Sequence, residues 1–160
     1  MNGEVFIRPL TVEDAAVSVN WRNDAEIWKY AGRKPDRVIT SEMEREWAAN
    51  VIADKSRLNF AICLNPSKRY IGNIYIKGVS GRFGGVAVFI GEKGCWGRGY
   101  GRAALRLLLA EAARRGFREL EISVHKDNVA AIITYLKCGA KMPSSWQGDW
   151  IIMKFDISGD

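Results

Sequence analysis

The stretch Val86-Ala-Val-Phe-Ile-Gly91, followed by Glu92-Lys-Gly-Cys-Trp-Gly-Arg-Gly-Tyr-Gly-Arg102 and a Leu- and Ala-rich run up to Gly116, decides the fold of this chain. It predicts an apolar strand, a glycine-rich loop and a long helix. Glycines at positions 97, 99 and 101 leave backbone N–H groups uncovered where the helix begins. With the positive end of the helix dipole and the nearby Arg98 and Arg102, those amides form a seat for a pyrophosphate, and so predict a nucleotide-bearing ligand.

Two familiar phosphate-binding motifs fit this loop poorly. A Walker A loop is excluded, because no Gly-Lys-Ser/Thr follows the glycines. The spacing Gly99-x-Gly101-x-x-Ala104 matches a Rossmann fingerprint, but the acidic residue expected about 20 positions later should end the next strand. Glu119 and Glu121 instead begin that strand, and the unit starts past mid-chain. A glycine turn that merely starts a helix remains an alternative.

The loop resembles motif A of the GNAT acetyltransferases, an Arg/Gln-x-x-Gly-x-Gly/Ala sequence at a helix start. Here it is Trp96-Gly-Arg-Gly-Tyr-Gly101, with Trp96 where the family prefers Arg or Gln. Loops of the form Trp-Gly-x-Gly-Tyr-Gly/Ala resemble the branch that contains the ribosomal-protein N-acetyltransferases. The resemblance implies a coenzyme A site made by Phe89, Ile90, Gly91, Trp96, Gly97, Arg98, Gly99, Tyr100, Gly101 and Arg102.

A second motif lies downstream, after the predicted strand 119–124. The residues Asn128, Ala131, Tyr135 and Gly139 are similar to the GNAT hallmark Asn-x-x-Ala-x-x-x-Tyr-x-x-x-Gly-Phe, with Ala140 in place of Phe. Asn128 is also a good helix N-cap. The resemblance implies that Asn128 binds the pantetheine arm and that Tyr135, two helical turns later on the same face, is catalytic. A plain core role for Tyr135 is the alternative.

The remaining segments predict an α/β fold in one domain, residues 1–160. We expect capping boxes at Thr11–Asp14 and Ser41–Glu44, the second opening a helix with Met43, Trp47, Val51 and Ile52 on one face. We expect strands at 5–8, 58–64, 70–76, 86–91, 119–124, 141–146 and 150–155, turns at 65–68 and 78–85, and helices after residues 14, 41, 101 and 128. This strand-helix-helix-strand-strand-strand-helix-strand-helix-strand-strand order, with a mixed, largely antiparallel sheet, resembles the GNAT fold.

Acetyl transfer from a thioester to a primary amine, by direct attack in a ternary complex, makes three chemical demands. The oxyanion needs fixed donors, which backbone amides of residues 89–91 offer. The departing thiolate needs an acid, and Tyr135 has a reference pKa about 1.5 above that of a thiol. The amine needs a base. Glu46 is the side chain we select, with Glu42, Glu44, Asp24, Glu26, His125 and a water relay left open.

The acceptor side is less defined by sequence. A polar and aromatic patch made by Trp21, Arg22, Asn23 and Tyr30 predicts an acceptor pocket in which Arg22 meets a phosphate or carboxylate. A helix end packed by a Trp is the alternative. The Trp-Arg-Asn sequence also resembles nucleotide-linked amino-sugar N-acetyltransferases. Amino-sugar nucleotides, protein N-termini and small amines therefore remain open as acceptors, as do acyl groups larger than acetyl.

Composition limits the partners. The net charge of +6 is concentrated along the glycine loop and its helix, without aromatic-interleaved basic stripes, so we expect no nucleic-acid partner. No apolar run reaches the roughly 18 residues of a membrane span. Cys63, Cys95 and Cys138 form no metal-binding spacing, and with no signal peptide visible they suit a reducing cytoplasm. We expect acetyl-CoA as co-substrate, no metal, and an open possibility of homodimers. The alternative function is a non-catalytic CoA- or nucleotide-binding regulatory domain.

Overall fold

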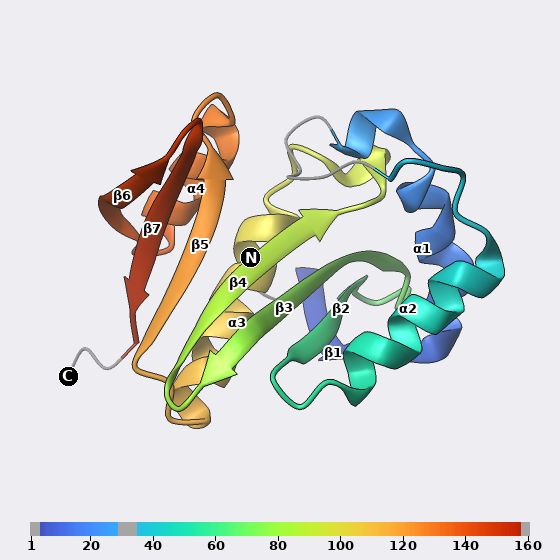
Figure 1. Cartoon of the computed structure of the whole chain (residues 1–160), viewed down its shortest axis with the longest axis horizontal. Coiled ribbons are helices and arrows are strands. Elements are labelled where there is room, and N and C mark those ends of the chain that lie inside the picture. The colour runs from blue at the N-terminus through green and yellow to red at the C-terminus, as the bar shows by residue number, and fades with distance from the viewer. Residues whose placement is uncertain (1–3, 29–34, 158–160) are drawn as a thin grey trace.

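A computed structural model of the chain describes residues 4–28 and 35–157 (Figure 1). The strands are β1 Val5–Pro9, β2 Leu58–Leu64, β3 Tyr70–Ser80, β4 Phe83–Ile90, β5 Glu119–His125, β6 Lys141–Gln147 and β7 Trp150–Asp156. The α-helices are α1 Ala15–Arg22, α2 Ser41–Ala53, α3 Tyr100–Arg114 and α4 Val129–Lys137. Short 3-10 turns η2, η3 and η4 cover Val12–Asp14, Ala25–Trp28 and Lys93–Cys95. The predicted order of helices and strands is confirmed.

The strands form a seven-stranded sheet in the order β1-β2-β3-β4-β5-β7-β6. Every neighbouring pair is antiparallel except β4 and β5, which run parallel. The β4–β5 pairing covers only the first part of β4 and ends at Val86 and Ile122. Beyond that pair the two strands diverge towards their C-terminal ends (Figure 1). The sheet is therefore open along the second half of β4.

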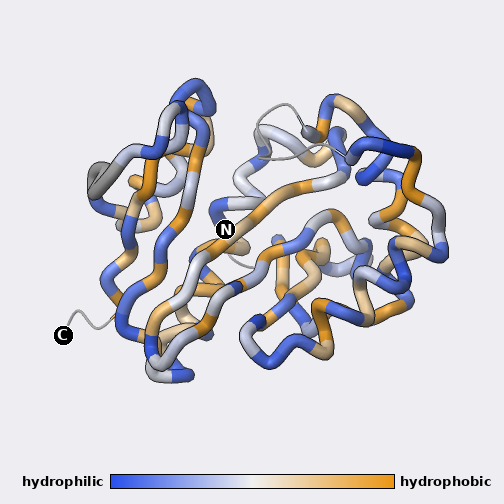
Figure 2. The backbone as a smooth tube through the Cα atoms, in the orientation of Figure 1, coloured by the Kyte–Doolittle hydropathy of each residue, from blue (hydrophilic) through white to orange (hydrophobic). Residues whose placement is uncertain are grey.

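Helices cover the sheet from both faces, and each face has its own core. Alternation of side chains sends Ile74 and Val86 into a large cluster with α3 and Tyr135, and sends Ala61 and Tyr70 into a smaller cluster with Trp21 of α1 and Val51 of α2. Figure 2 shows hydrophobic residues along the central strands and hydrophilic residues at the turns. On the face covered by α1 and α2, α1 lies beside the C-terminal end of β4.

Local details differ from two predictions about α2. Its N-cap is Thr40, whose hydroxyl accepts the Met43 N–H, and not Ser41. The side chain of Glu44 does not return to the N-cap, because it points into the protein interior. Ile52 is 43 % exposed, so the buried face of α2 is made by Glu44, Ala48 and Val51. The Glu44 carboxylate is therefore buried, whereas the capping-box pattern predicted that it would bond to the N-cap at the helix surface.

The turn between β3 and β4 is also tighter than predicted. The sequence predicted a turn over 78–85, whereas β3 continues to Ser80 and β4 starts at Phe83. Ser80 pairs with Phe83, and Gly81 between them adopts a positive φ of 60°. A register shift between Lys77 and Ser80 absorbs the irregular residues that suggested a longer turn.

Candidate active site

The glycine loop enters α3 through a left-handed residue. Gly99 is the N-cap of α3 with a φ of 82°, a conformation that glycine adopts without the cost of a Cβ. No side chain caps this helix end, and the first helical N–H to find a carbonyl is that of Ala103, which donates to the Gly99 oxygen at 3.0 Å. The N–H groups of Tyr100, Gly101 and Arg102 thus precede the first helical hydrogen bond, as the first amides of any helix do. A 15-residue helix places its positive dipole end there.

Charged and polar side chains surround this helix start. Arg98 is exposed and donates its Nε–H to the carbonyl oxygen of Gly94 at 3.1 Å. A guanidinium nitrogen of Arg102 lies 3.6 Å from the point where a Cβ on Gly99 would sit. Gly97, at a φ of 74°, has open space around its missing side chain. The loop thus presents free amides, two guanidinium groups and no side-chain obstruction.

The end of β4 supplies a further amide. The Gly91 N–H donates to the Ile71 oxygen on β3 at 2.8 Å. Because backbone groups alternate along a strand, the N–H and C=O of Phe89, two residues earlier, also point to β3. The Ile90 N–H and C=O then point to the opposite edge, beyond the last β4–β5 pair. The Ile90 oxygen accepts the indole N–H of Trp96 at 2.7 Å, which agrees with that orientation. The sequence offered the amides of residues 89–91 as oxyanion donors. Of these, the Ile90 N–H points to the open edge of β4, whereas the Gly91 N–H is bonded to the Ile71 oxygen.

Trp96 joins the loop to β4. Its ring is 41 % exposed while its Nε1–H is bonded to the Ile90 oxygen. Because this contact links the residue before the first loop glycine to the last residue of β4, it fixes where the loop leaves the strand. The Trp96 indole therefore ties the loop to β4, at a position where the GNAT motif more often has Arg or Gln.

Asn128 and Tyr135 lie on α4, which follows β5. β4 and β5 are parallel and end at the same edge of the sheet. The helices that follow them, α3 and α4, therefore both begin at that edge. Asn128 is the N-cap of α4 and its side-chain oxygen accepts the Ala131 N–H at 3.3 Å. Helices α3 and α4 touch where Arg106 donates to the Lys137 oxygen and the Cys138 thiol lies 3.8 Å from the Arg102 oxygen.

The Tyr135 ring is buried, with 8 % of the residue exposed, within the core cluster below α3. Among the described residues every fully buried side-chain polar atom has a hydrogen-bond partner. The Tyr135 hydroxyl has no hydrogen-bond partner among these residues, so its oxygen is not one of the fully buried atoms and keeps some contact with solvent. Burial, with a smaller contribution from the charge of the Cys138 thiolate, raises the pKa of Tyr135 to about 12. The hydroxyl is therefore protonated at neutral pH.

The segment Trp21-Arg22-Asn23 is engaged inside the protein. Trp21 is 5 % exposed, and its Nε1–H donates to Glu92 at 3.2 Å. Arg22 lies 3.0 Å from the Glu44 carboxylate and stacks over Trp47, with its guanidinium carbon 4.3 Å from the ring centroid. The Asn23 amide donates to the Val19 and Ile39 oxygens and accepts the Ile39 N–H. The Nε of Arg22 is therefore engaged by Glu44, and its role in binding an acceptor stays a prediction. Tyr30 lies outside the described residues.

Sequence reasoning missed a buried polar cluster beneath α1 and α2. Ser18 donates to Glu44 at 2.6 Å, and Tyr70 donates to the side-chain oxygen of Asn73. Ser18, Glu44 and Asn73 are each no more than 3 % exposed. Burial, reinforced by the nearby Asp14 carboxylate, raises the pKa of the Tyr70 hydroxyl well above its ordinary value. The i, i+4 spacing of Ser18 and Arg22 on α1 was the sequence signal for a shared partner.

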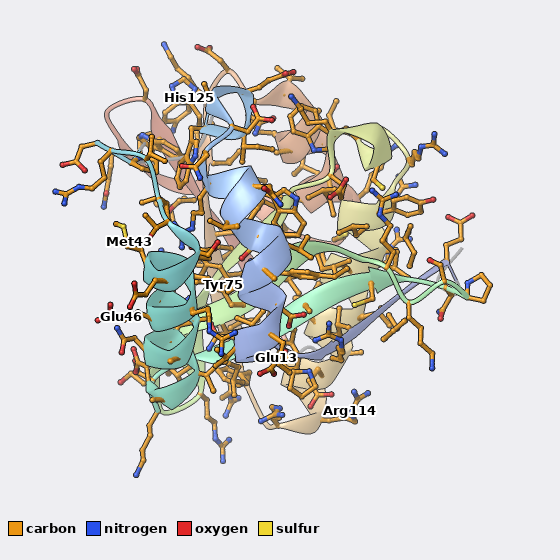
Figure 3. All side chains as sticks on the ribbon, turned by 90° about the vertical axis from the view of Figure 1, so that its right-hand side faces the viewer. Glu13, Met43, Glu46, Tyr75, Arg114 and His125 are labelled. Atoms are coloured by element: carbon orange, nitrogen blue, oxygen red, sulfur yellow. The ribbon has the colours of Figure 1, made fainter. Side chains whose placement is uncertain are left out.

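The candidate bases differ sharply in position. Glu46 points to solvent from the outer side of α2, away from α1 (Figure 3), so the geometry gives no support to its selection. Glu44 is buried and satisfied by Ser18 and Arg22. Lys93 lies 2.8 Å from Asp24 and 3.3 Å from Glu26, and its hydrogen bond holds the pKa of Asp24 below the usual value. A lowered pKa makes Asp24 a weaker base.

His125 ends β5 at the edge where β4 and β5 diverge, and Figure 3 labels it near one end of the molecule. Its ring meets that of Trp150 edge-on, with centroids 5.4 Å apart, and its Nδ1 accepts the Asp127 N–H at 3.1 Å. His125 is thus held against Trp150 and the turn at Asp127, at the sheet edge.

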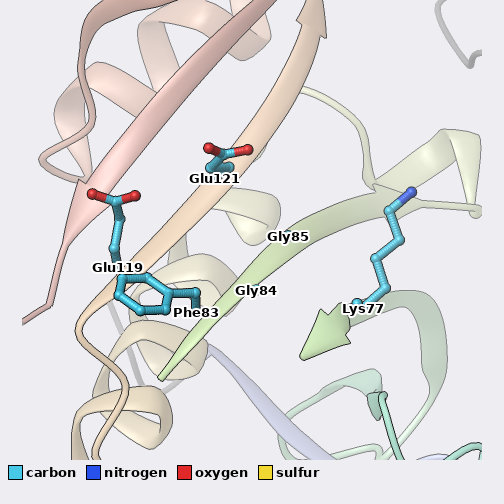
Figure 4. Close-up of a pocket in the computed structure, with 7 residues that line it drawn as sticks. Lys77, Phe83, Gly84, Gly85, Glu119 and Glu121 are labelled. Carbon is cyan, nitrogen blue, oxygen red and sulfur yellow. The ribbon is translucent and has the colours of Figure 1, made fainter. Parts of the chain in front are cut away.

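A hollow of about 480 Å³ lies elsewhere on the sheet (Figure 4). Its floor is the pair Gly84 and Gly85, and its walls carry Lys77, Glu119 and Glu121. Gly84, Gly85 and the two glutamates lie at the starts of β4 and β5, and Lys77 lies on β3 beside them. The glycine loop follows the end of β4, so the two places are roughly 20 Å apart along an extended strand. Lys154 lies within 3.9 Å of both glutamates, which partly neutralises the wall. This hollow is separate from the candidate site.

Searches for two other kinds of site gave no candidates within the described parts of the chain. No group of three or more His, Cys, Asp or Glu side chains among residues 4–28 and 35–157 is placed to hold a metal ion. None of the helices in those ranges has both the length and the apolar character that a membrane crossing needs.

Comparisons with known proteins agree on the fold. The family model described as an acetyltransferase (GNAT) domain matches residues 4–141. The structure of spermidine N-acetyltransferase from Vibrio cholerae with CoA and spermine has a TM-score of 0.84 at 18% identity, covering 97% of this chain and 96% of that one. A domain from Methanocaldococcus jannaschii gives 0.82 at 19% identity, over 96% and 98%. Aminoglycoside acetyltransferase AAC(6')-Ib with coenzyme A gives 0.78 at 20% identity, over 95% and 94%.

A relative among curated proteins is longer than this chain. Protein MJ1062 of Methanocaldococcus jannaschii is 21% identical over 153 residues, which make up 94% of this chain and 31% of the relative. The chain therefore spans about a third of that relative's length. The family model covers most of the chain, including both sequence motifs as far as residue 141, and the solved neighbours share its fold. This chain belongs to the GNAT acetyltransferase domain family.

Proposed function

We propose that the chain binds acetyl-CoA and transfers its acetyl group to a primary amine. The observation that carries the proposal is that three sets of hydrogen-bond donors, on the segments at or after the C-terminal ends of β4 and β5, have no hydrogen-bond partner among the described residues. They are the first amides of α3, the Ile90 N–H beside the open half of β4, and the Tyr135 hydroxyl. Because these donors are not bonded within the protein, a ligand can accept from them without breaking an internal hydrogen bond.

Each set has a role in this proposal. The α3 amides with Arg98 and Arg102 bind the pyrophosphate, and Asn128 binds the pantetheine arm. The Ile90 N–H donates to the thioester oxygen, whose negative charge grows as the amine attacks. The amine nitrogen bonds to the carbonyl carbon, the C–S bond breaks, and the sulfur receives a proton from Tyr135. The tyrosinate regains a proton from the newly formed amide nitrogen, so the net transfer is one amine proton to the thiol.

The pKa of Tyr135 restricts how this proton moves. A value of about 12 is roughly 3.5 above the reference value of a thiol. Complete transfer to a free thiolate would then cost about 5 kcal/mol, since each pKa difference of one corresponds to about 1.4 kcal/mol. Tyr135 therefore hydrogen-bonds to the developing thiolate and passes its proton to the sulfur only as it regains one from the amide nitrogen, so that no free tyrosinate accumulates. The amine loses its first proton through water, as Glu46 is placed away from the site.

The acceptor class in this proposal is a small amine, an amino-sugar nucleotide or a protein N-terminus. Small amines are supported by two structural neighbours, which are a spermidine and an aminoglycoside acetyltransferase by name. The alternative is a domain that binds CoA without catalysis. It is favoured by one observation, that the Trp21 Nε1–H, the Arg22 Nε–H and the Asn23 side-chain amide bond to groups of the same chain.

A ligand titration followed by an activity screen tests the proposal. In a thermal-shift assay acetyl-CoA and CoA at 100 times their dissociation constants should stabilise the fold by about 2.7 kcal/mol, and NAD(P)H should not. Thiol release is then followed with polyamines, aminoglycosides, amino-sugar nucleotides and peptides as acceptors. Stabilisation by NAD(P)H and not by CoA contradicts the whole proposal. CoA binding with no acetyl transfer to any acceptor favours the non-catalytic alternative.

A further inference from the structure

The Trp21 indole lies directly on the backbone at the end of β4. A Cβ built on Gly91 would stand 2.0 Å from the ring carbon Cδ2 of Trp21 and 2.4 Å from two further ring atoms. Such distances mean that the ring covers the face of Gly91 where any other residue carries its side chain. Gly91 itself is buried. The ring and the glycine are therefore in close van der Waals contact with no space between them.

The indole is held rigidly in that position. Its centroid lies 4.8 Å from that of Tyr70 and 5.9 Å from that of Phe89, the second contact being edge-on. Its Nε1–H is bonded to Glu92, whose carboxylate is also held by Arg69 at 2.8 Å. Contacts on several sides and a hydrogen bond leave a large aromatic ring few alternative rotamers.

Gly91 follows Ile90, whose N–H faces the open edge of β4. Glycine restricts its own backbone less than any other residue, so a strand that ends in glycine is loose unless something packs against it. Trp21 provides that packing, while the bond from the Gly91 N–H to Ile71 holds the same residue from the β3 side. The direction of the Ile90 amide is thus set by contacts on either side of its neighbour.

The acceptor-side helices hold Trp21 in turn. Arg22, the next residue, is paired with Glu44 of α2, and Asn23 is bonded to the backbone of Ile39. A second tie links Lys93, just after β4, to Asp24 and Glu26. Segment 21–26 is therefore fixed to segment 91–93 by packing, hydrogen bonds and ion pairs.

We propose that Trp21 is a positioning residue that orients the Ile90 N–H towards the thioester oxygen of acetyl-CoA. The inference rests on the proposed function, because it assigns a role within that reaction. Trp21 touches no substrate in this proposal and acts through Gly91. Its place in the sequence motif Trp-Arg-Asn is then explained by geometry at β4 rather than by contact with the acceptor.

The test measures the Ile90 amide directly and does not require an acceptor. The protein is labelled with ¹⁵N-isoleucine, and the Ile90 resonance is assigned with Ile90→Val. In the wild type, acetyl-CoA should move this amide proton downfield relative to CoA, since only acetyl-CoA has the carbonyl. In Trp21→Leu the acetyl-specific shift should be lost, and in Trp21→Phe, which keeps a ring but no N–H, it should be reduced.

Turnover supplies the second readout, with the acceptor found in the screen. We expect kcat of Trp21→Leu to fall by about 10²-fold, the size of effect that a 1 Å misplacement can produce. The dissociation constant for acetyl-CoA, set by the pyrophosphate loop, should stay near that of the wild type. Trp28→Leu is the matched control, because its indole donates to the Arg22 oxygen at 2.9 Å on the same segment. It should keep the acetyl-specific shift even if it lowers stability.

Each outcome separates the two proposals. A Trp21→Leu protein that keeps the shift and the wild-type kcat overturns the positioning role and leaves the proposed function standing. A wild type that shows the acetyl-specific shift, lost in Trp21→Leu, but acetylates no amine supports positioning and contradicts catalysis. If Trp21→Leu does not fold, Trp21→Phe decides: an unchanged shift and kcat in that variant overturn the inference.

Discussion

The cofactor side of the site and the acceptor-side helices use their polar groups in opposite ways. On the cofactor side, the first amides of α3, the Ile90 N–H and the Tyr135 hydroxyl have no use within the described structure. On the acceptor side, the side chains of Arg22, Asn23 and Glu44 are bound to each other or to backbone. Polar groups without a protein partner can bond to a ligand without breaking an internal hydrogen bond, whereas those of the acceptor-side helices already have partners in the same chain.

The difference shows that equally polar motifs can have unlike roles. Trp21-Arg22-Asn23 has the composition of a binding pocket, yet its partners are Glu92, Glu44 and Ile39 of the same chain. The glycine loop has little side-chain chemistry, yet its backbone is exposed at a helix dipole. The state of pairing, and not the residue type, separates a binding motif from a structural one. Four changes test this contrast.

Tyr135→Phe should give the largest effect. If its hydroxyl assists the departing sulfur, kcat should fall by about 10²- to 10⁴-fold while acetyl-CoA affinity stays close to wild type. Because the pKa of Tyr135 is about 12, the wild type should also keep its activity as pH rises through 10. Steady-state kinetics from pH 6 to 10.5 measure both. A stable variant with unchanged kcat would make Tyr135 a core residue only.

Gly101→Asp should weaken acetyl-CoA binding by about 10²-fold or more, since a carboxylate would face the pyrophosphate and repel it. The substitution adds little strain: Gly101 is helical and a Cβ there would lie 4.0 Å from the nearest atom, on Ile90. Isothermal titration calorimetry with acetyl-CoA measures the effect, and Gly101→Ala is the uncharged control. Normal affinity in the aspartate variant would show that the loop binds no phosphate.

Glu44→Gln should act on stability and not on cofactor binding. Breaking a buried ion pair costs about 3–5 kcal/mol when both partners are fully buried, and Arg22 is 25 % exposed, so we expect about 2–3 kcal/mol. Urea denaturation gives the free energy of unfolding. Glu46→Gln, on the exposed side of the same helix, should change it by less than about 0.5 kcal/mol. Equal losses in the two variants would contradict the assignment of Glu44 as an internal tie.

Asp14→Asn should have the smallest effect, visible mainly in acid. Burial raises the pKa of Asp14, but hydrogen bonds from Arg8 and Thr11 outweigh it and leave the pKa below its usual value. A lowered pKa contributes stability above the pKa of the unfolded chain, near 3.8, and that stability is lost as pH falls through the folded value. The variant should lose about 1–2 kcal/mol at neutral pH and less in acid. The same loss at pH 3 and pH 7 would contradict this linkage.

Local patterns predicted the fold and the glycine-rich start of α3 well because their causes are local. Glycines at a helix start, an N-cap asparagine and alternating strands each follow from neighbours within a few residues. The motif with Asn128 and Tyr135 could be placed beside the loop because both follow strands of one parallel pair. The exact ends of β3 and β4 could not, since the register shift at Lys77 depends on the partner strand.

The contacts of the acceptor side could not be predicted, because they join residues that are far apart in the sequence. Glu44 is separated by 26 residues from Ser18, and Trp21 by 71 residues from Glu92, so the sequence does not identify either partner. The i, i+4 spacing of Ser18 and Arg22 indicates only that the two share a face of α1. Glu44 and Glu46 look alike in sequence, yet one is 1 % exposed and the other faces solvent. Only the crossing of α1 over α2 and β4 decides which carboxylate turns inward.

The open half of β4 has one consequence for handling the protein. A strand whose edge is unpaired offers a template on which another extended chain can add, and apolar strands such as Val86–Ile90 are prone to self-association. Trp96 blocks one carbonyl of this edge by bonding to the Ile90 oxygen. The amide-bearing arm of bound CoA would cover more of it. We therefore expect preparations stored without CoA to aggregate faster than preparations stored with it, and light scattering over time would record the difference.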